Sequence, residues 1–593
     1  MLTMFLWLLS LSQWTITPSL ASDFSIQIPP GDNASWGTTG AYDSSSAAGL
    51  GLLVGNTFSS STTSSSSSSK EQPSQCYVTV LDPEDRTIVG PQRTAMDLSF
   101  CMGGAVWIER DEPSPSRGGM AIVAGISTDK GNSQRQAFLQ PIDGVGDGLS
   151  SSSSSSVNRP FIPLPPLTVP VAMASGKTAQ GSEIHEAGAF FVAVHQDRDG
   201  LGPISYDDDY EEASNPLESA WAYWNRVSKA GQFTSDTEPK ILKFDALMDT
   251  AEPVFTIHLN DEAISDIVLD EDETTTVIAG MQVVGSTLIV VGSTKGSGND
   301  SVGVSTTNSD DWDGFVAFYS TVTGTQESEP IRIGSSTRKN DYIYNLCTSG
   351  GGGGAPDSDL YLVGRTDGSL LPRSGARRVG GAFVQKLNLQ TKQVQWTTEI
   401  DGTLTDGLAC VASDDVIYLG GQTMIDLRLQ QEDKEKQLPP LESQAVFVTA
   451  LSPSTGDIEW IQHLDSSTSS SSLRRDELIQ LHITEQNNDH DAYVLMNSMD
   501  LLSGVSTVVW LDLDRAAGDH AGFSSINFGN GIDKTNTPRI LLGATTLIII
   551  CLAVLLFSRQ KTYGKRRRQV EEVLAPQDLA LEHDLPHQGK ELV

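Results

Sequence analysis

The sequence has little basic charge and few charged or apolar residues for its length. Of its 593 residues, 39 are Lys or Arg and 75 are Asp or Glu, which gives a net charge of −36. A surface this acidic repels phosphate backbones, so the charge argues against nucleic acid as a partner. Hydrophobic residues make up 38% and charged residues 19%, while 54 glycines and several serine runs fill the difference. This composition predicts a β-rich chain with many turns rather than a long-helix protein.

Motifs for catalysis or cofactor binding are also lacking. The chain contains no HExxH pair, no GxSxG elbow, no phosphate-binding loop and no dinucleotide GxGxxG motif after a strand. The glycine run 350–354 is not followed by Lys and Ser or Thr. We therefore expect no cofactor and lean against enzymatic activity. A glycan-acting ectoenzyme stays open as an alternative, because glycosidase carboxylates can lie far apart in sequence.

Two short acidic segments are candidate calcium loops. Asp197 and Asp199 precede a glycine, as alternate oxygen ligands do in such loops. A twelve-residue calcium loop containing them would begin at His195, and its twelfth position is then Tyr206 and not Glu, which excludes an EF-hand. Asp311 and Asp313 form the second segment, beside Asp310. Calcium is the one metal that these patterns indicate.

The two ends of the chain predict secretion and membrane anchoring. Residues 2–20 are mostly apolar and lead into small residues, so we expect a signal peptide over 1–21. Residues 540–557 form an uncharged, mainly apolar run that spans about 27 Å as a helix, enough to cross a bilayer. A Lys/Arg cluster at 561–568 marks the cytoplasmic side. The sequence thus predicts a single-pass type I membrane protein with residues 22–539 outside or in a lumen and a short tail, 558–593, inside.

Four of the five cysteines lie in the predicted ectodomain: Cys76, Cys101, Cys347 and Cys410. An even number of cysteines in an oxidising compartment predicts disulfides. Proximity in sequence favours Cys76–Cys101 and Cys347–Cys410, although four cysteines allow three connectivities. Asn33 and Asn299 each stand in an N-x-Ser pattern and are candidate N-glycosylation sites.

The interior of the chain repeats at intervals of about 60 residues. Each repeat holds three to four apolar strands with turn signals between them. The clearest strands begin at 287, 359, 415 and 491, and each is followed by a second conspicuous strand, beginning near 313, 380, 444 and 505. Short strands at this spacing predict a β-propeller of about seven blades, with six or eight as alternatives. Two packed β-sandwich domains are the other fold considered.

Part of the chain resembles a known repeat family. Asp359-LYLVGRTDG, followed by Gly380-GAFVQKLNLQTKQVQW, resembles the bacterial beta-propeller repeat family, and Leu451-SPSTGDIEW resembles the tryptophan-docking segment of quinoprotein-like propellers. Trp396 and Trp460 stand at the matching positions. The resemblance is clearest over 280–515 and implies a propeller fold, but it implies little about activity.

Serine-rich runs at 59–69, 150–156 and 466–472 predict unstructured segments, and residues 197–240 form an acidic insert that also contains tryptophan. The predicted organisation is a low-complexity segment over 22–73, with a short strand near 24–28, then a propeller over 74–515 and a stalk over 516–539. We expect a module that binds a protein or glycan ligand. A luminal assembly or sorting factor of the secretory pathway is the second alternative.

Overall fold

The computed structural model describes strands and turns in the part of the chain between residues 24 and 512. The described residues are 24–28, 34–42, 51–58, 74–82, 87–94, 99–108, 119–127, 136–145, 161–166, 168–175, 189–197, 237–245, 252–259, 275–295, 311–335, 339–349, 359–371, 380–402, 405–425, 427, 440–464, 475–486, 489–500 and 503–512. The chain divides into two units, Met1–His520 and Ala521–Val593, and all of these residues lie in the first.

The described residues form β-strands, and no α-helix occurs among them. In chain order the strands are β1 (Phe24–Ile28), β2 (Ala34–Tyr42), β3 (Gly51–Phe58), β4 (Ser74–Asp82), β5 (Thr87–Thr94), β6 (Ser99–Ile108), β7 (Gly119–Ser127), β8 (Ala137–Val145), β9 (Ile162–Pro163), β10 (Thr168–Ser175), β11 (Ala189–Asp197), β12 (Thr237–Asp245), β13 (Phe255–His258), β14 (Thr275–Val284), β15 (Thr287–Lys295), β16 (Trp312–Ser320), β17 (Gln326–Ile333), β18 (Asp341–Thr348), β19 (Asp359–Thr366), β20 (Gly381–Asn388), β21 (Gln393–Asp401), β22 (Thr405–Ala412), β23 (Ile417–Ile425), β24 (Pro440–Leu451), β25 (Ile458–Leu464), β26 (Arg475–Gln486), β27 (Asp489–Asp500) and β28 (Ser503–Asp512).

These strands pair into antiparallel sheets of consecutive strands. Five sheets have four strands each: β2–β5, β6–β9, β10–β13, β14–β17 and β18–β21. The remaining strands form one eight-stranded sheet, in which β22–β25 and β26–β28 are joined by a single parallel pair between β24 and β26. Strand β1, from the start of the chain, pairs with β28 from the end, so the first and last strands of the fold share a sheet.

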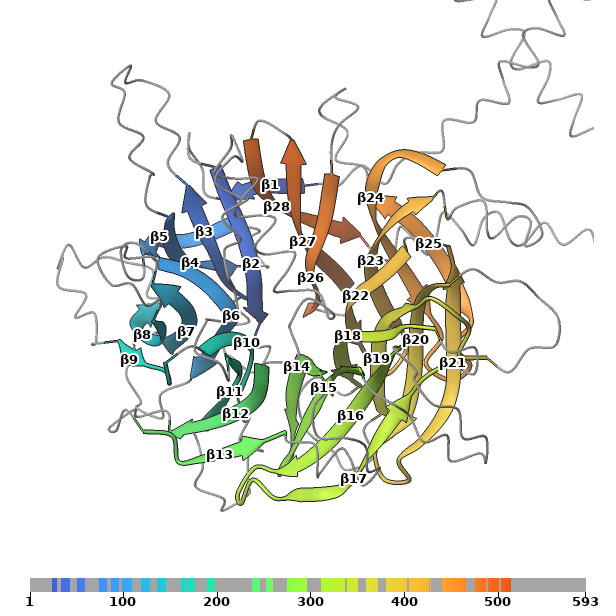
Figure 1. Ribbon diagram of the computed structural model, residues 1–593. Helices are drawn as coiled ribbons and strands as arrows, with labels where there is room; N and C mark the ends of the chain where they lie inside the picture. The colour runs from blue at the N-terminus through green and yellow to red at the C-terminus, as the bar shows by residue number, and fades with distance from the viewer. Residues whose placement is uncertain are drawn as a thin grey trace, which may run out of the picture. The chain divides into compact units, whose positions relative to one another are not determined.

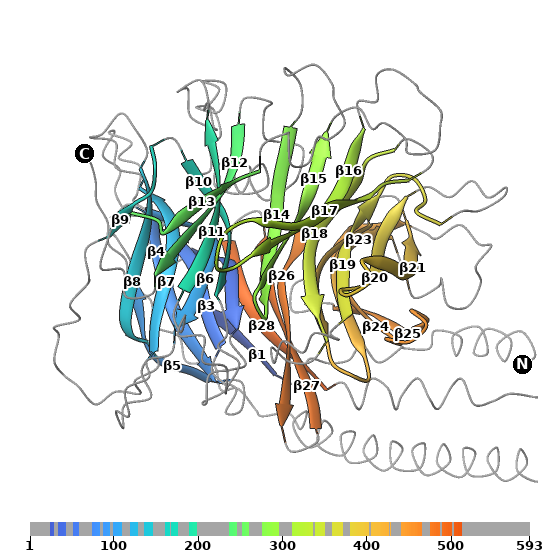
Figure 2. The same cartoon turned by 90° about the horizontal axis from the view of Figure 1, so that it is seen from below.

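The sheets follow one another around a ring (Figure 1), and the view from below shows the same order (Figure 2). The first strand of each sheet contacts the first strand of the next, along the series β2, β6, β10, β14, β18, β22 and β26, and β26 in turn contacts β2. The first strands therefore lie innermost and the fourth strands outermost. This is a propeller-like all-β fold, and the alternative of two β-sandwich domains is wrong.

The innermost strands share one local irregularity. Each pairs with its second strand through a ladder whose register shifts at a β-bulge, for example between Ile278 and Gly280 and between Ile343 and Asn345. In five of the seven ladders a glycine of the second strand lies opposite the residue that precedes this bulge, and in the other two that residue is Val194 or Met496. At Gly364 a Cβ atom would overlap the carbonyl oxygen of Tyr342, so any larger residue would force the strands apart. Strands β15, β19 and β23 share a Gly-x-Thr (G-x-T) motif that begins at Gly292, Gly364 and Gly421, and in each of them the glycine allows this close backbone approach.

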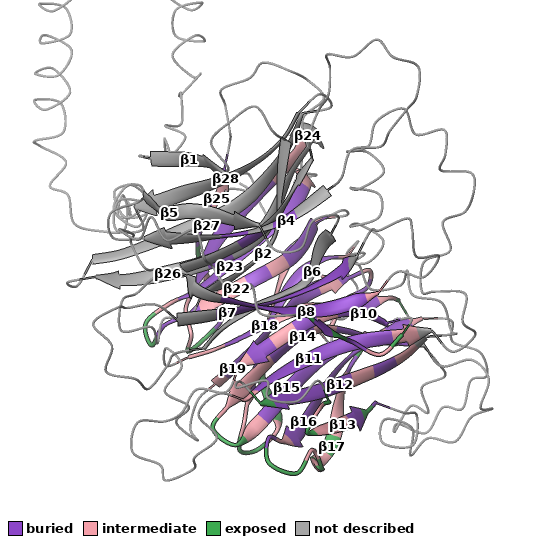
Figure 3. Cartoon of the chain, turned by 90° about the vertical axis from the view of Figure 1, so that its left-hand side faces the viewer, coloured by how far each residue is buried: buried purple, intermediate pink, exposed green. Residues whose placement is uncertain are grey.

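The core lies between neighbouring sheets rather than inside each one. Ile343 of β18 and Phe383 of β20 pack with Val291 and Phe318 of the preceding sheet, and all four are fully buried. Figure 3 shows buried residues running along the central strands and exposed ones at the turns. Each sheet is apolar on both faces and cannot bury them alone, which is why the repeats must stack.

The strands predicted to begin at 287, 359, 415 and 491 are confirmed as β15, β19, β23 and β27. Those predicted near 313, 380, 444 and 505 are confirmed as β16, β20, β24 and β28, and the short strand near 24–28 is β1. The prediction for residues 22–73 is otherwise wrong, because β2 and β3 belong to the sheet that β4 and β5 complete. Small residues dominate β2, whereas buried Val54 and Val78 of β3 and β4 fix that sheet. The acidic insert ends at 236, since β12 begins at Thr237. The serine-rich runs lie outside the described residues.

Candidate ligand-binding site

One position of the second strand forms the polar contact between neighbouring sheets. In the ladder between the first and second strands, we count residue pairs from the β-bulge toward the N-terminal end of the first strand. The second-strand residue of the second such pair is called the junction position. The register gives His195 in β11, Ser293 in β15, Arg365 in β19 and Gln422 in β23. The same place in four successive repeats therefore holds four different side chains.

At two of these junctions a neutral side chain accepts a hydrogen bond from the next sheet. The backbone N–H of Ile278 in β14 donates to Nε2 of His195 over 3.3 Å. The N–H of Ile343 in β18 donates to Oγ of Ser293 over 3.2 Å. Both acceptor residues are fully buried. Because an unpaired buried N–H is costly, these contacts explain why the junction position is polar inside an apolar interface.

The junction between β19 and β22 is built differently, because Arg365 has no acceptor atom. Its Nη2 and Nε donate to Oδ1 of Asp367 over 2.7 and 2.8 Å, and its Nη1 lies 3.6 Å from Oδ1 of Asp406 in β22. Gln422 of β23 donates to the other oxygen of Asp406 over 2.9 Å. One guanidinium thus lies between two carboxylates from neighbouring sheets, where the His195 and Ser293 junctions have a neutral hydrogen bond.

Two stacked tyrosines of β18 adjoin this charged group. The rings of Tyr342 and Tyr344 are parallel within 4°, with centroids 6.1 Å apart, and Trp312 packs beside Tyr342 at 6.0 Å. Tyr344 is the extra residue of the β18 bulge, since Ile343 pairs with Gly364 and Asn345 with Val363. Bulges re-aim side chains and are common beside functional sites. Both tyrosines are half-buried, so part of each side chain reaches solvent.

The electrostatics keep both phenols neutral. Burial raises the pKa of Tyr342 to about 12, and the charge of Asp367 acts in the same direction. Burial, with the nearby charge of Asp406, holds the pKa of Tyr344 well above its ordinary value. Neutral tyrosines offer ring faces and hydroxyl groups for contact at physiological pH.

A third carboxyl group lies at the start of β18. Asp341 is fully buried and accepts a hydrogen bond from the N–H of Ser335. Burial raises its pKa to about 6, while hydrogen bonds from Thr366 and Ser335 act in the opposite direction. Its Oδ1 atom has no hydrogen-bond partner among the described residues. The same is true of Oδ1 of Asp406, which is 8% exposed.

The turn that carries Asp367 is held in place from the outer strand. Glu399 of β21 accepts hydrogen bonds from the backbone N–H groups of Leu370 and Leu371 and from the hydroxyl of Ser369. The N–H of Gly368 donates to Thr366 over 3.0 Å. Asp367 is therefore presented by a turn whose backbone groups are paired, so the carboxylate of the site is pre-organised.

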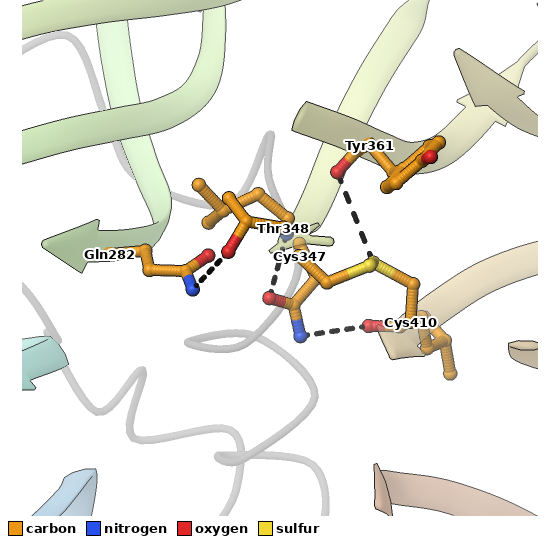
Figure 4. Close-up of a disulfide and its surroundings, with 8 residues drawn as sticks. Gln282, Cys347, Thr348, Tyr361 and Cys410 are labelled. Atoms are coloured by element: carbon orange, nitrogen blue, oxygen red, sulfur yellow. Dashed lines mark hydrogen bonds between the residues drawn. A yellow bond between two sulfur atoms is a disulfide. The ribbon is translucent and has the colours of Figure 1, made fainter. Parts of the chain in front are cut away.

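Further along the same innermost strands, a disulfide joins Cys347 of β18 to Cys410 of β22, with Cα atoms 5.7 Å apart (Figure 4). This is the pairing that sequence proximity favoured. Gln282 of β14 donates to Thr348 over 2.9 Å beside it. Cys76 is also disulfide-bonded, and the side chain of Cys101 lies outside the described part. The sheets that meet at Arg365 are thus also linked covalently.

The structure describes three of the four candidate calcium ligands. Asp311 and Asp313 lie at the start of β16, Asp197 ends β11, and Asp199 lies outside the described residues. Within the described part, no group of three or more His, Cys, Asp and Glu side chains could hold a metal ion. Nor does any helix of that part have the length and apolar character needed to span a membrane. The segment 540–557, Asn33 and Asn299 all lie outside it.

Sequence reasoning did not identify Tyr342, Tyr344, Arg365 or Asp406 as site residues. One signal was present in the G-x-T motif, where the β19 repeat has Arg365 and the β15 repeat has Ser293. A charged residue at a place that is otherwise neutral breaks the local rule of the repeat. Such breaks are expected at functional sites.

No protein-family model matches the chain, and no curated protein matches it, so the repeat family that it resembles is not confirmed. Among solved structures, the chain is similar to the Dos1 propeller, with 9% identity, a TM-score of 0.35, and coverage of 80% of this chain and 78% of that one. The polysaccharide lyase Uly1 gives 9% identity, a TM-score of 0.40, and coverage of 78% and 88%. The β-propeller domain of the trilobed protease from Pyrococcus furiosus gives 6% identity, a TM-score of 0.33, and coverage of 76% and 92%. At these identities the likeness concerns the fold alone.

Proposed function

We propose that this chain is a single-pass type I membrane protein whose seven-bladed propeller ectodomain is a recognition module for a protein or glycan ligand. The blade count rests on the single parallel pair inside the eight-stranded sheet: we divide that sheet into β22–β25 and a last blade of β26–β28 completed by β1. A strand from the start of the chain then closes the ring against the strand that ends it.

The observation that carries the recognition function is the Arg365 junction. Neighbouring junctions use a buried neutral acceptor, which is enough to join two blades. A guanidinium between Asp367 and Asp406 does not serve stability better, because burying charges costs desolvation that the ion pair barely offsets. Stacked, half-buried tyrosines adjoin this group. Aromatic faces with a few fixed polar groups are characteristic of binding sites.

Compartment and topology are inferred from the sequence and supported by the disulfide. Disulfides persist in oxidising compartments, so the Cys347–Cys410 bond supports a location of the propeller in one of them. The apolar run 540–557 with its basic flank then provides the anchor. If Asn33 and Asn299 face the lumen or the outside, removal of N-linked glycans from the purified chain lowers its apparent mass. An unchanged mass in both Asn33→Gln and Asn299→Gln variants would contradict this topology.

The binding experiment uses the full-length chain in detergent micelles, applied to intact cells and to a glycan array, with calcium and with chelator. We expect saturable binding to one class of ligand, reduced at least tenfold by Arg365→Ser. Arg332→Ser, which removes an arginine from the outer strand β17, is the matched control and retains binding. Absence of binding to cells and glycans by a correctly folded chain would overturn the proposal.

A further inference from the structure

We propose that the Arg365 site binds a cationic group, a primary ammonium or a guanidinium, which the ligand inserts against Tyr342 and Tyr344. This inference rests on the proposed recognition function and narrows it to one ligand chemistry. Its starting observation is the imbalance between hydrogen-bond donors and acceptors at the site.

The donors of the site are already engaged. Arg365 directs Nε and Nη2 to Asp367 and Nη1 toward Asp406. Gln422 donates Nε2 to Asp406, and Asn340 places Nδ2 3.4 Å from the second oxygen of Asp367. A ligand rich in acceptors would therefore find few free donors among these side chains.

One acceptor, in contrast, accepts no hydrogen bond within the described part of the chain. Oδ1 of Asp406 is buried, and its contact with Nη1 of Arg365 at 3.6 Å is an ion pair longer than a hydrogen bond. A buried acceptor without a donor is costly, and a ligand that donates offsets this cost. Ammonium and guanidinium groups donate and do not accept, which matches this inventory.

The charges favour the same class of ligand. One guanidinium faces the carboxylates of Asp367 and Asp406, so this group of three carries net negative charge. The faces of Tyr342 and Tyr344 are the negative ends of their ring quadrupoles and attract cations. The chain as a whole carries −36, which steers a basic partner toward it and repels an acidic one.

Two sources could supply such a group: a Lys or Arg side chain of a partner protein, or a free polyamine. The test measures binding of a fluorescent hexalysine peptide and of spermidine to the full-length chain at physiological ionic strength. The same peptide with acetylated lysines serves as the uncharged probe. Tight binding of the peptide with weak binding of spermidine assigns the site to a partner protein, and the reverse assigns it to a small amine.

Any acidic protein attracts cations weakly, so probe binding alone does not locate the site. The comparison of two variants does. Asp406→Asn removes charge from the site, and Asp457→Asn removes the same charge from the exposed β24–β25 turn. We expect Asp406→Asn to weaken probe binding at least tenfold and Asp457→Asn to change it less than twofold. Equal effects of the two substitutions, or equal binding of the acetylated peptide, would overturn the inference.

Tyr344→Leu keeps all the carboxylates and removes one ring, so it decides the question if Asp406→Asn does not fold. We expect at least a fivefold loss of probe binding, and unchanged binding would count against the site. Different outcomes contradict the recognition function and the cationic ligand. Cell binding that depends on Arg365 but is not displaced by hexalysine leaves the recognition function intact and removes the cationic ligand. Absence of any cell binding removes the recognition function itself.

Discussion

Two junctions between neighbouring sheets occupy equivalent places in the repeat, but one has a neutral side chain and the other a charged one. At the β15–β18 junction, fully buried Ser293 accepts one hydrogen bond from the N–H of Ile343. At the β19–β22 junction, Arg365 lies between two carboxylates, with stacked tyrosines beside it. The first arrangement is sufficient to join two sheets. The second brings charge and aromatic surface that joining does not require, and the proposed binding function accounts for this difference.

Exchanging the two junction residues gives the largest expected effect. Ser293→Arg places a guanidinium in a fully buried position, and the place in β18 that corresponds to Asp406 of β22 holds Tyr342 and not a carboxylate. An unpaired buried charge costs about 3–5 kcal/mol, so we expect a fall in thermal midpoint of many degrees or loss of folding. Thermal unfolding followed by circular dichroism measures it. A midpoint close to that of the unmodified chain would show that the two junctions are interchangeable.

A second way to separate the junctions is to lower the pH. Burial lowers the pKa of His195 to about 3, below its unfolded value of 6.5. The stability that the neutral imidazole contributes is therefore complete above pH 6.5 and is lost as the pH falls toward 3, by about 2 kcal/mol at pH 5.

Asp341, with its pKa raised to about 6, acts in the opposite direction. Its folded-state pKa lies above the unfolded value of 3.8, so it contributes stability at low pH that is lost as the pH rises through 6. We expect His195→Gln to flatten the acid side of the stability profile and Asp341→Asn to steepen it. Denaturant titrations between pH 7 and 5 test both slopes, and parallel profiles for the two variants would contradict these assignments.

Two tryptophans at equivalent places in the outer strands differ in their contacts, and we expect a smaller effect on stability there. Trp396 of β21 donates Nε1 to the carbonyl of Pro453 in the next sheet over 3.1 Å, and Lys386 donates to the same oxygen. Because the oxygen keeps Lys386, Trp396→Phe should cost only about 1 kcal/mol. Trp460, the matching tryptophan of β25, packs on Tyr418 of its own sheet. Equilibrium unfolding measures the loss of stability in Trp396→Phe and in Trp460→Phe. A loss of 3 kcal/mol in Trp396→Phe would show that its hydrogen bond to Pro453 contributes more than a shared acceptor implies.

The repeats let most of the fold be predicted, because a strand is encoded by residues next to one another. Asp359–Thr366 reads as a strand with a glycine near its end, and it is β19. The failure at β2 has the opposite cause. Its residues, ASWGTTGAY, carry no strong apolar alternation, and the strand exists because β3 pairs with it. The candidate site could not be predicted for a similar reason, since Arg365 and Asp406 meet only through stacking of two repeats.

We propose that the Arg365 junction serves binding and not stability, and substitution of Arg365 tests this proposal most directly. Arg365→Ser installs the residue of the neighbouring junction, where Ser293 accepts a hydrogen bond from the following strand. Because this substitution alone leaves the buried carboxylate of Asp406 without its cation, it is combined with Asp406→Asn. We expect the free energy of unfolding of this double variant to stay within about 1 kcal/mol of the unmodified chain, because the whole ion pair has small net worth. Binding to cells should fall at least tenfold in the same preparation. Unchanged binding together with a large loss of stability would contradict the account and make Arg365 a structural residue.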